Sequence, residues 1–554
     1  MIPLDEILDI LLLLAVVLIV SWFLSAYVAG IFSDSPSKRL DRILIPIENA
    51  IYKVTGVDPD HKMSWKEYCI AAVFVNIVQM AIAFVILTEQ GILPLNPMHY
   101  QGFSWDLAFN TVISFATNTN LQHYAGEMQL SNLSQMTAIQ FLQFTSAATG
   151  VCVAIAMVRG FVVRSSNLGN FYVDFIRSLT RLLIPICFIA AIVMIALGVP
   201  QTLTAATTLK TVEGASQTIL TGPVASLVSI MQVGTNGGGF YGANSAYPFQ
   251  NPNPVTDVAQ IFLMLLLPTT LTFVFGRMIG RKRESKPIVV GAYLLFAIDL
   301  AIAFIPNPVA IGPGLETRFG GFMSTLWTVV TTAVTTGSVN SSLLGNNPLA
   351  ILSAFLGMMI QATPGGKGVG LMYMIMFIII TVFIVGLMSG RTPEYLGMKI
   401  TGHDVKLVMV AFLIHPLIII VPTLIAYGGG FVEAIGLNGS SLSFTQILYE
   451  YTTAAANNGS DFLGTTANTP FFNISTGIVM LLGRYAPIFL LLAVAGSMLG
   501  RKRLASEAAL KTDSWAFSLV LVASIILLVV LTFFPFLALG PILAYYQGHT
   551  NFFP

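Results

Sequence analysis

The sequence predicts an all-α polytopic membrane protein with ten transmembrane helices: four pseudo-symmetric repeats of span, pore loop and span around one pore, with one extra helix at each end. Three observations predict it: the composition, the apolar runs and a motif that recurs four times. Of the 554 residues, 55% are hydrophobic and 9% are charged, and the mean hydropathy is +0.81. Since a soluble domain carries roughly 25% charged residues, an integral membrane protein is expected.

Ten apolar runs are long enough to cross the hydrocarbon core, which takes about 20 residues of helix. They lie near 7–30, 66–88, 133–158, 171–198, 256–280, 287–306, 371–390, 404–427, 473–499 and 515–540. Asp5, Glu6 and Asp9 lie just before or at the start of the first run, whose uninterrupted apolar part is Leu11 to Val20. A signal peptide begins with basic residues instead, so we expect a retained first span. The net charge of +1 gives no basic excess for a nucleic-acid partner.

Basic residues are concentrated on every second connection between these runs. The connections after the first, third, fifth, seventh and ninth runs contain Lys38, Arg39, Arg42, Lys53, Lys62, Arg159, Arg164, Arg277, Arg281, Lys282, Arg283, Lys286, Arg391, Lys399, Lys406, Arg501, Lys502, Arg503 and Lys511. The intervening connections contain Lys210 and Arg318. Because cytoplasmic loops carry the excess of Lys and Arg, the pattern supports ten spans and predicts that both termini lie outside the cytoplasm.

Four of the outer connections contain a shorter helical segment, at 105–116, 223–234, 322–334 and 443–456. About a dozen residues give roughly 18 Å of helix at 1.5 Å per residue, which is too short for a core of about 30 Å. A single segment of this kind would suit an amphipathic helix on the surface. Four of them, each followed by a polar segment, predict half-helices that enter the membrane from outside and lead into pore loops.

The polar segments align with one another. They are TNTNLQHYAGE (117–127), TNGGGFYGANS (235–245), TTGSVNSS (335–342) and NNGSDFLG (457–464). In the predicted alignment the columns are Asn118, Asn236, Thr336 and Asn458, then Thr119, Gly237, Gly337 and Gly459, then Asn120, Gly238, Ser338 and Ser460. Such repeats are common in transport proteins. The expected divisions are 1–64 (first span), 65–165, 166–284, 285–400 and 401–505 (repeats, the third with a broken helix) and 506–554 (last span and outer tail).

The residue types of these segments suit a filter for K⁺. Rings of backbone carbonyls can replace the water shell of this ion, and glycine lets successive carbonyls point the same way. Irregular backbone at membrane depth is tolerated where it lines a cavity, and the C-terminal ends of half-helices favour a cation. The aligned columns contain no Asp or Glu, so a divalent-cation site with an acidic ring is not expected.

Several strings closely resemble the A subunit of the Kdp potassium-transporting ATPase. They are NTNLQ, GTNGGGFYGANSAYPFQNP (234–252), TGSVN, AANNGSDF (455–462) and GRY (483–485). The Trk, Ktr and HKT transporters share the four-loop plan but not these strings. The resemblance covers essentially the whole chain. It implies the K⁺-binding subunit of a high-affinity ATP-driven uptake pump in the lipids of the bacterial inner membrane, which passes K⁺ through an intramembrane tunnel to a P-type ATPase subunit (Kdp B), with Kdp C and Kdp F.

By position, the resemblance implies a set of filter residues for K⁺ and no organic cofactor. The set is Asn118, Thr119, Asn120, Thr235, Asn236, Gly237, Thr336, Gly337, Ser338, Asn458, Gly459 and Ser460. Thr119 is expected to stand where the other loops have glycine, and Gln122 matches a glutamine just past the first loop. No catalytic residue is expected, because the chain has no DKTGT string and the GGKGVG segment at 365–370 lacks the Ser or Thr of a Walker A motif.

Residues on the inner side of the expected filter are candidates for gating or coupling. They are Gly365, Gly366, Lys367, Gly368 and Arg484, with Asp299 a weaker candidate. The glycines would interrupt a helix that runs from about 349 to 389; the alternative is a separate outer helix at 349–362. Arg484 lies near the middle of the ninth span, where an arginine is unfavourable and marks a functional candidate. It acts either at the filter base or only as a structural partner.

Two functions other than that of a pump subunit are considered for this sequence. A stand-alone K⁺ channel or gradient-coupled transporter of the same architecture would draw on about 2.3 kcal/mol per charge per 100 mV of membrane potential. A neighbouring gene for a P-type ATPase with DKTGT would argue against it. An intramembrane enzyme is disfavoured, because His403 and His415 lack a second ligand at helical spacing and Ser497 is not in a G-x-S-x-G turn.

Overall fold

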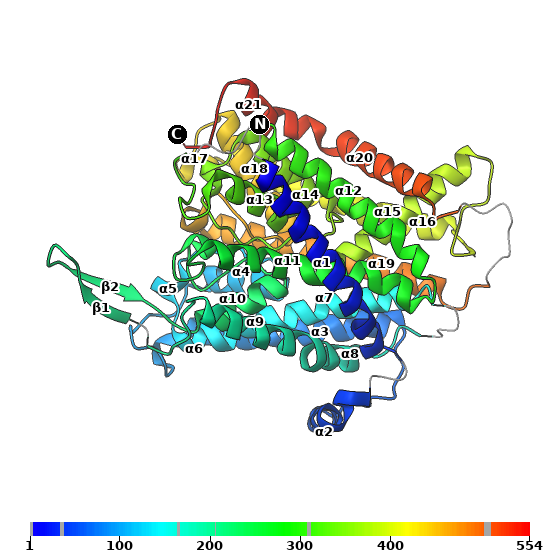
Figure 1. The fold of residues 1–554 in the computed structure, drawn as a ribbon, viewed down its shortest axis with the longest axis horizontal. Coiled ribbons are helices and arrows are strands. Elements are labelled where there is room, and N and C mark those ends of the chain that lie inside the picture. Colours follow the sequence, from blue (N-terminus) through cyan, green and yellow to red (C-terminus); the bar gives the residue numbers. More distant parts are fainter. Residues whose placement is uncertain are drawn as a thin grey trace.

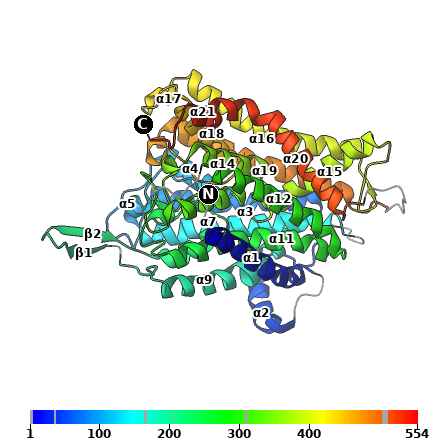
Figure 2. The same cartoon turned by 45° about the horizontal axis from the view of Figure 1, so that its top comes forward.

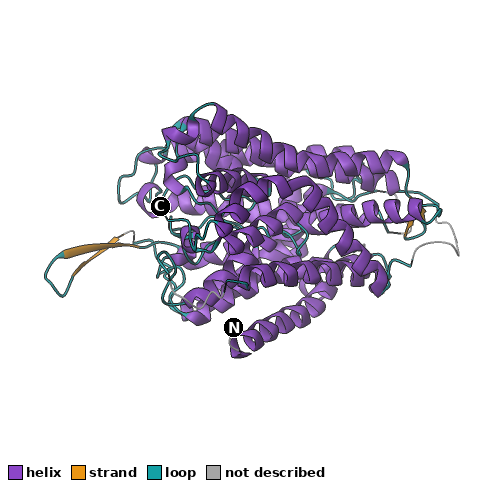
Figure 3. Ribbon diagram, turned by 90° about the horizontal axis from the view of Figure 1, so that it is seen from above, coloured by secondary structure: helices purple, strands orange, loops and turns teal. Residues whose placement is uncertain are grey.

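The computed structural model describes residues 4–33, 38–162, 167–204, 206–306, 312–502 and 511–553, and these are mostly helical (Figure 3). Ten helical stretches among them are long and apolar enough to cross a membrane, as predicted. They are Leu4–Ile31, Trp65–Thr88, Asn132–Gly160, Phe171–Ala196, Pro254–Met278, Lys282–Phe304, Val369–Met388, Gly402–Gly428, Pro470–Met498 and Trp515–Tyr546. Of the basic residues used above to distinguish the connections, Arg164 and Arg503 lie outside the described residues.

The spans consist of single helices or of helices joined by wider π turns. They are α1 (Leu4–Ile31), α3 (Trp65–Thr88), α6 (Asn132–Ser134) with α7 (Phe141–Arg159), α8 (Phe171–Arg177) with α9 (Ile184–Ala196), α11 (Pro254–Met278), α12 (Ser285–Phe304), α15 (Val369–Met388), α16 (Gly402–Gly428), α19 (Pro470–Met498) and α20 (Trp515–Leu537) with α21 (Leu543–Tyr546). Local sequence signals mark the first residues of several of these helices. Ser64 and Glu67 form a capping box at α3, and Thr401 and Asp404 form another at α16, which satisfies the free N–H groups of the first turn.

Four short helices alternate with the spans and confirm the predicted half-helices. They are α4 (Trp105–Ala116), α10 (Val224–Val233), α13 (Gly320–Ala333) and α18 (Ser441–Ala455). The order of span, half-helix and span therefore occurs four times, in α3–α4–α7, α9–α10–α11, α12–α13–α15 and α16–α18–α19. The two extra helices lie outside these repeats, α1 along α11 and α20 along α12. Figure 1 shows all four half-helices in the same half of the bundle.

Several smaller elements lie outside the spans and half-helices. Strands β1 (Ala206–Lys210) and β2 (Ser216–Leu220) pair antiparallel, with Thr208 opposite Thr218, and project as a hairpin (Figures 1 and 2). Both chain ends lie toward the hairpin end. Helix α2 (Lys38–Thr55) stands apart from the bundle. The remaining short elements are α5 (Gly126–Gln129), α17 (Phe431–Ala434), β3 (Glu394–Tyr395) and β4 (Met398–Lys399).

The predicted interruption before the seventh span is present. Helix α14 (Pro348–Ile360) is buried and packs on α12 and α13. It ends where Gln361 adopts a left-handed conformation with φ of 53°. The segment 361–368 then leads to α15, and the N–H of Gly365 donates to the carbonyl of Ala333 at 2.9 Å. Because Ala333 is the last residue of α13, this segment lies against the end of a half-helix.

Candidate functional site

Each half-helix ends in a five-residue segment, and the four segments share one hydrogen-bond pattern. We call them pore loops 1 to 4; they are residues 117–121, 234–238, 334–338 and 456–460. The second residue of each loop has a positive φ, which is 68° at Asn118, 43° at Thr235, 44° at Thr335 and 51° at Asn457. The N–H of each third residue donates to the carbonyl five residues earlier, at 2.9 Å for Thr119, 2.7 Å for Asn236, 2.7 Å for Thr336 and 2.9 Å for Asn458.

This geometry corrects the predicted alignment of pore loop 1 by one residue. Thr119, not Asn118, is equivalent to the third residues of the other loops. The residue that stands in place of a glycine is therefore Asn120, whose φ is 59°, compared with 90° at Gly337 and 107° at Gly459. Asparagine adopts this left-handed conformation more readily than most residues, so Thr119 does not replace a glycine.

The same geometry bears on which residues can be proposed for the site. Ser338 and Ser460, which belong to the predicted set, occupy the fifth position of pore loops 3 and 4, in line with Gly238 as predicted. The second residues of these two loops, Thr335 and Asn457, are not in the predicted set. Counting from the last residue of each half-helix would have found both missing residues.

The four third residues present backbone carbonyls that form no hydrogen bonds within the described chain. All four residues have an exposed fraction of 0%, and no described residue donates to the carbonyl oxygens of Thr119, Asn236, Thr336 and Asn458. These loops meet closely. A Cβ atom on Gly237 would lie 2.6 Å from the oxygen of Thr119 and 2.7 Å from that of Asn458. Because buried carbonyls are nearly always paired, this group, which we call the carbonyl ring, is suited to a cation.

Carbonyls next to the ring are held by the surrounding scaffold instead. In three loops the carbonyl of the fifth residue accepts a side-chain hydrogen bond: Leu121 from Ser114 Oγ at 3.0 Å, Gly238 from Gln143 Nε2 at 2.8 Å, and Ser338 from Trp327 Nε1 at 2.7 Å. The carbonyl of Gly237 accepts from Asn244 Nδ2 at 2.7 Å. Pore loop 2 therefore differs from the others at its fourth position. Asn244 lies within the string GTNGGGFYGANSAYPFQNP that the sequence analysis singled out, but its hydrogen bond to the carbonyl of Gly237 was not predicted.

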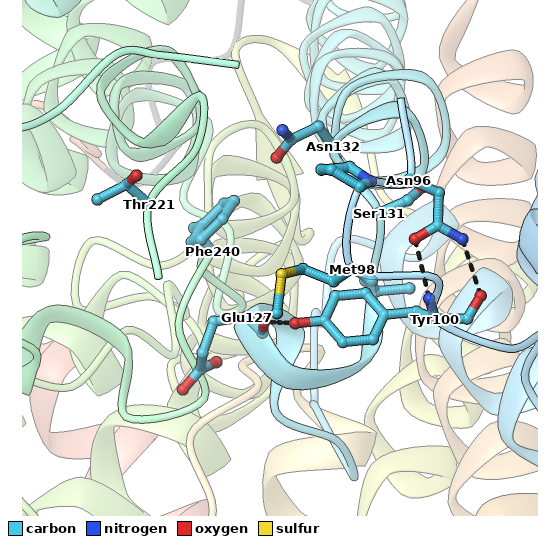
Figure 4. A pocket seen from close by; sticks show the side chains of 10 residues that line it. Asn96, Met98, Tyr100, Glu127, Ser131, Asn132, Thr221 and Phe240 are labelled. Atoms are coloured by element: carbon cyan, nitrogen blue, oxygen red, sulfur yellow. Dashed lines mark hydrogen bonds between the residues drawn. The ribbon is translucent and has the colours of Figure 1, made fainter. Parts of the chain in front are cut away.

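Side chains outside the ring tie pore loop 1 to the chain that follows pore loop 2. Gln122 donates from Nε2 to the carbonyl of Gly239 at 3.2 Å and accepts from the N–H of Gly239 at 3.0 Å. Glu127 Oε2 accepts from the N–H of Gly242 at 2.7 Å. The backbone carbonyl of Glu127 accepts from the Tyr100 hydroxyl at 2.6 Å (Figure 4). Gln122, predicted as a coupling candidate, therefore positions the glycine-rich loop.

A buried acidic group lies on the outer side of the ring. His123 Nε2 lies 3.1 Å from Glu450 Oε1, and both side chains are fully buried. Burial lowers the pKa of His123, but the hydrogen bond and charge of Glu450 outweigh it, so that the pKa is raised. Asp461, which follows pore loop 4, has a pKa raised to about 7 by burial and then by the charge of Glu450. This outer mouth is therefore anionic above neutral pH.

A small cavity lies on the inner side of the ring. Its wall includes the second residue of every pore loop, and its lining residues are Asn118, Thr235, Thr335, Gln361, Gly366, Lys367, Val369, Ala456, Asn457 and Arg484. The Lys367 side chain, 2% exposed, donates from Nζ to Asn118 Oδ1 and lies 3.5 Å from Thr235 Oγ1. Arg484, 5% exposed, donates from Nη2 to the carbonyl of Ser146 at 3.1 Å. Within the described chain, no carboxylate pairs with either basic side chain. Burial, and then the charge of Arg484, lower the pKa of Lys367 well below its usual value.

The segment 361–368 closes this cavity by close backbone contact. A Cβ atom at Gly366 would collide with Thr335 Oγ1, and one at Gly368, whose φ is 86°, would collide with the carbonyl of Gly150. A Cβ on Gly150 would in turn lie 2.7 Å from the Lys367 carbonyl and 3.2 Å from Arg484 Nη2. The structure therefore brings the predicted glycines, Lys367 and Arg484 together beneath the ring.

Asp299, the weaker candidate, is not among the residues that line this cavity. Its side chain is 1% exposed, and its backbone carbonyl accepts from Ser353 Oγ at 2.8 Å. Two of the three residues weighed for an enzyme, Ser497 and His415, have polar neighbours of their own. Ser497 Oγ donates to Asp404 Oδ1 at 2.5 Å, and a His415 ring nitrogen lies 3.1 Å from Gln361 Nε2.

Comparisons with known proteins agree on one family. Residues 11–546 match the family described as potassium-transporting ATPase A subunit. Two relatives are named potassium-transporting ATPase potassium-binding subunit. That of Alicyclobacillus acidocaldarius is 46% identical over 97% of this chain and 98% of its own, and that of Caldanaerobacter subterraneus is 43% identical over 96% and 98%. The solved potassium transporter TrkH from Vibrio parahaemolyticus shares the fold, with a TM-score of 0.52 and 16% identity over 87% of this chain and 97% of that one.

Proposed function

We propose that this chain, which belongs to the family of potassium-transporting ATPase A subunits, binds and selects K⁺ from outside in its four pore loops. The single observation that carries the proposal is the carbonyl ring, whose four buried oxygens accept no hydrogen bond from the described chain. A dehydrated K⁺ needs fixed oxygens in place of water, and rings of backbone carbonyls supply them. The four half-helices aim their negative C-terminal ends at the same place, which favours a cation.

The proposed filter follows the corrected alignment. It consists of the second, third and fourth residues of each pore loop, which are 118–120, 235–237, 335–337 and 457–459. Asn120, Gly337 and Gly459 supply the left-handed backbone at the fourth position. Ser338 and Ser460 support the loops from outside the filter.

The inner side of the ring supports a function in a pump rather than in an open channel. Two buried basic side chains, Lys367 and Arg484, line the cavity that an ion would have to cross. Burial, and then the charge of Arg484, lower the pKa of Lys367 well below its usual value, so the positive charge beneath the ring is that of the Arg484 guanidinium. Like charges repel strongly where water is excluded, so Arg484 opposes direct passage and the Lys367 side chain obstructs it. We propose that K⁺ instead leaves sideways, through an intramembrane tunnel, to a P-type ATPase subunit that hydrolyses ATP. By family, that subunit is Kdp B, with Kdp C and Kdp F in the same complex.

The proposed membrane is the bacterial inner membrane, with both termini outside the cytoplasm. The basic connections support this orientation, because they alternate along the chain and cytoplasmic loops carry such an excess. The same orientation places the anionic outer mouth toward the K⁺ that is to be taken up.

The proposal is tested by K⁺-stimulated ATPase activity of the purified complex with Gly237→Asp. A side chain at Gly237 would displace the carbonyls of Thr119 and Asn458, so the K⁺ concentration for half-maximal activity should rise at least tenfold, about 1.4 kcal/mol. Gly312→Asp is the matched control. It adds the same carboxylate on an outer connection, where a Cβ atom meets nothing within 4 Å, and should leave the K⁺ requirement unchanged.

An unchanged K⁺ requirement in Gly237→Asp would refute the filter assignment. A second measurement separates the pump from a channel. Wild-type K⁺ flux through vesicles that contain this chain without any ATPase subunit would favour a stand-alone channel. Absence of flux, together with ATP-dependent uptake by the whole complex, is the expected result.

A further inference from the structure

Helix α2 lies below the bundle, away from the β1–β2 hairpin (Figures 1 and 2), and one side of it is apolar and exposed. Ile43, Ile47 and Val54 are 65%, 47% and 87% exposed. Their spacing of four and seven residues places them on one side of a helix. At 100° per residue, Arg42 and Lys53 lie roughly 100–120° around the helix from this side, on one flank of it. A helix with an apolar face and basic residues on its flank is suited to lie in a membrane interface.

Ion pairs fix this helix against the start of the fourth span. Arg181 donates from Nη1 to Asp41 at 2.7 Å, and from Nε and Nη2 to Glu48 at 2.7 and 2.8 Å. Glu48 is 3% and Arg181 3% exposed. The acidic face of α2 is therefore occupied by protein, whereas its apolar face is not covered by the described chain.

A crevice of about 510 Å³ opens between α2, α3 and α8. Its wall is largely apolar and includes Ile51, Phe74, Val75 and Phe175, while Asp58 lies at its rim. Val75 is ten residues from the start of α3, or about 15 Å at 1.5 Å per residue. This length is about half of a hydrocarbon core of about 30 Å. It is comparable to the length of one acyl chain.

Two polar groups without partners lie in or next to the crevice. Tyr52 lines it, is only 6% exposed, and its hydroxyl forms no hydrogen bond with the described chain. Arg177 is not one of the lining residues but directly follows Ile176, which is; it acts electrostatically on Tyr52, and its Nε is buried without a hydrogen-bond partner among the described residues. Arg181, one turn further along, is paired with two carboxylates. A hydroxyl and a guanidinium group together are well suited to an anionic phosphate.

We propose that this crevice binds an anionic phospholipid of the leaflet that faces the basic connections. The phosphate accepts hydrogen bonds from Tyr52 and Arg177, and one acyl chain lies along Phe74 and Val75. The apolar face of α2 continues this surface through Ile51 and lies in the surrounding lipid. The site is separate from the pore loops, so it does not depend on the filter assignment.

Native mass spectrometry of the purified complex tests the site with phosphatidylglycerol and with phosphatidylcholine of the same acyl chains. The wild type should retain one phosphatidylglycerol per chain that phosphatidylcholine does not replace. Arg177→Gln should lower this occupancy at least tenfold, about the loss of one charge-assisted hydrogen bond. Val75→Trp, which fills the crevice, should do the same, and Tyr52→Phe should cause a smaller loss. The controls are Arg391→Gln, an exposed arginine on another basic connection, and Val410→Trp, a valine 48% exposed on α16.

Equal phosphatidylglycerol retention by the wild type, Arg177→Gln and Val75→Trp would overturn the proposal. Equal retention of phosphatidylcholine would overturn the anionic headgroup, and displacement by excess inorganic phosphate alone would indicate a free-anion site. Crosslinking of a partner subunit to a cysteine at Tyr172, which lines the crevice, would identify a protein occupant and also contradict the proposal. K⁺ transport enters none of these measurements, so their outcome is independent of the pump function.

Discussion

The outer mouth and the inner floor of the pore carry opposite charges. On the outer side, Glu450 is buried near pore loop 4, and Asp461 follows that loop directly. On the inner side, Lys367 and Arg484 line the cavity beneath the loops. The carbonyl ring between these regions contains no charged side chain. In the proposed filter, a cation would therefore be attracted from one side, held by neutral dipoles and repelled from the other side.

Under the proposed function, this difference separates selectivity from direction. The carbonyl ring has no net charge to distinguish outside from inside, and its geometry would determine which ion fits. The charges on either side would determine where the ion can go. A passive channel would gain nothing from a buried arginine beneath its filter, whereas a subunit that delivers K⁺ to a motor would need a closed floor. Each of the following predictions removes one part of this arrangement.

The largest effect is expected for Gly459→Ala, which breaks the ring itself. Gly459 has φ of 107°, and an added Cβ would collide with the carbonyl oxygen of Thr119. Strain of this kind is worth on the order of 1–3 kcal/mol, and it falls directly on the ion ligands. K⁺-stimulated ATPase activity of the complex should be nearly abolished at K⁺ concentrations that saturate the wild type.

A matched control for this variant lies five residues further on. Gly464 also has a positive φ of 50°, but the nearest neighbour of an added Cβ is Asp461 Oδ1 at 3.9 Å. Gly464→Ala should keep K⁺-stimulated activity close to the wild-type level. If both variants lost activity equally, backbone strain in general, and not the ring, would explain the loss.

A smaller effect than that of Gly459→Ala is expected for Arg484→Gln, which removes a positive charge from the cavity beneath the ring. Removing one buried cation should raise passive K⁺ flux through the complex without ATP about tenfold, for about 1.4 kcal/mol of lost repulsion. Fewer K⁺ ions should be retained per ATP hydrolysed. Vesicle flux and ATPase rate, measured together, test this. Arg391→Gln, at an exposed position, is the control; unaltered passive flux in Arg484→Gln would assign the arginine a structural role.

Much of this arrangement could be predicted from the sequence. Span lengths and the fourfold repeat depend on local composition, so the helices and pore loops were found within a few residues. Glycine in pore loops 3 and 4 indicated the left-handed backbone directly. Pore loop 1 was misaligned because Asn120 adopts the same conformation with φ of 59°, and a search for glycine passes over it.

Contacts between distant residues could not be predicted from local patterns. Lys367 Nζ donates to Asn118, 249 residues away, and Arg484 Nη2 donates to Ser146, 338 residues away. The sequence predicted that a lysine and an arginine lie on the inner side. Which groups they contact depends on how the four repeats pack around the ring, and no short-range signal specifies that packing.

The smallest effect is expected at the outer mouth, where Asp461 titrates. Burial and the charge of Glu450 raise its pKa to about 7, so the carboxyl group is largely protonated at pH 6 and ionised at pH 8. Ionisation adds a negative charge beside pore loop 4 and should attract K⁺. The apparent K⁺ affinity of the wild-type complex should therefore increase about two- to threefold from pH 6 to pH 8, about 0.5 kcal/mol for a partly screened charge.

Asp461→Asn should weaken this pH dependence, because the titrating charge is removed. The pKa of His123 is also raised, because the hydrogen bond and charge of Glu450 outweigh burial, and this group should account for any remaining pH dependence. Glu213→Gln, on the exposed turn between β1 and β2, is the control and should behave as the wild type does. A full wild-type pH profile in Asp461→Asn would show that the outer carboxylate does not attract the ion. In that case only the basic residues that line the inner cavity would distinguish the two sides of the ring.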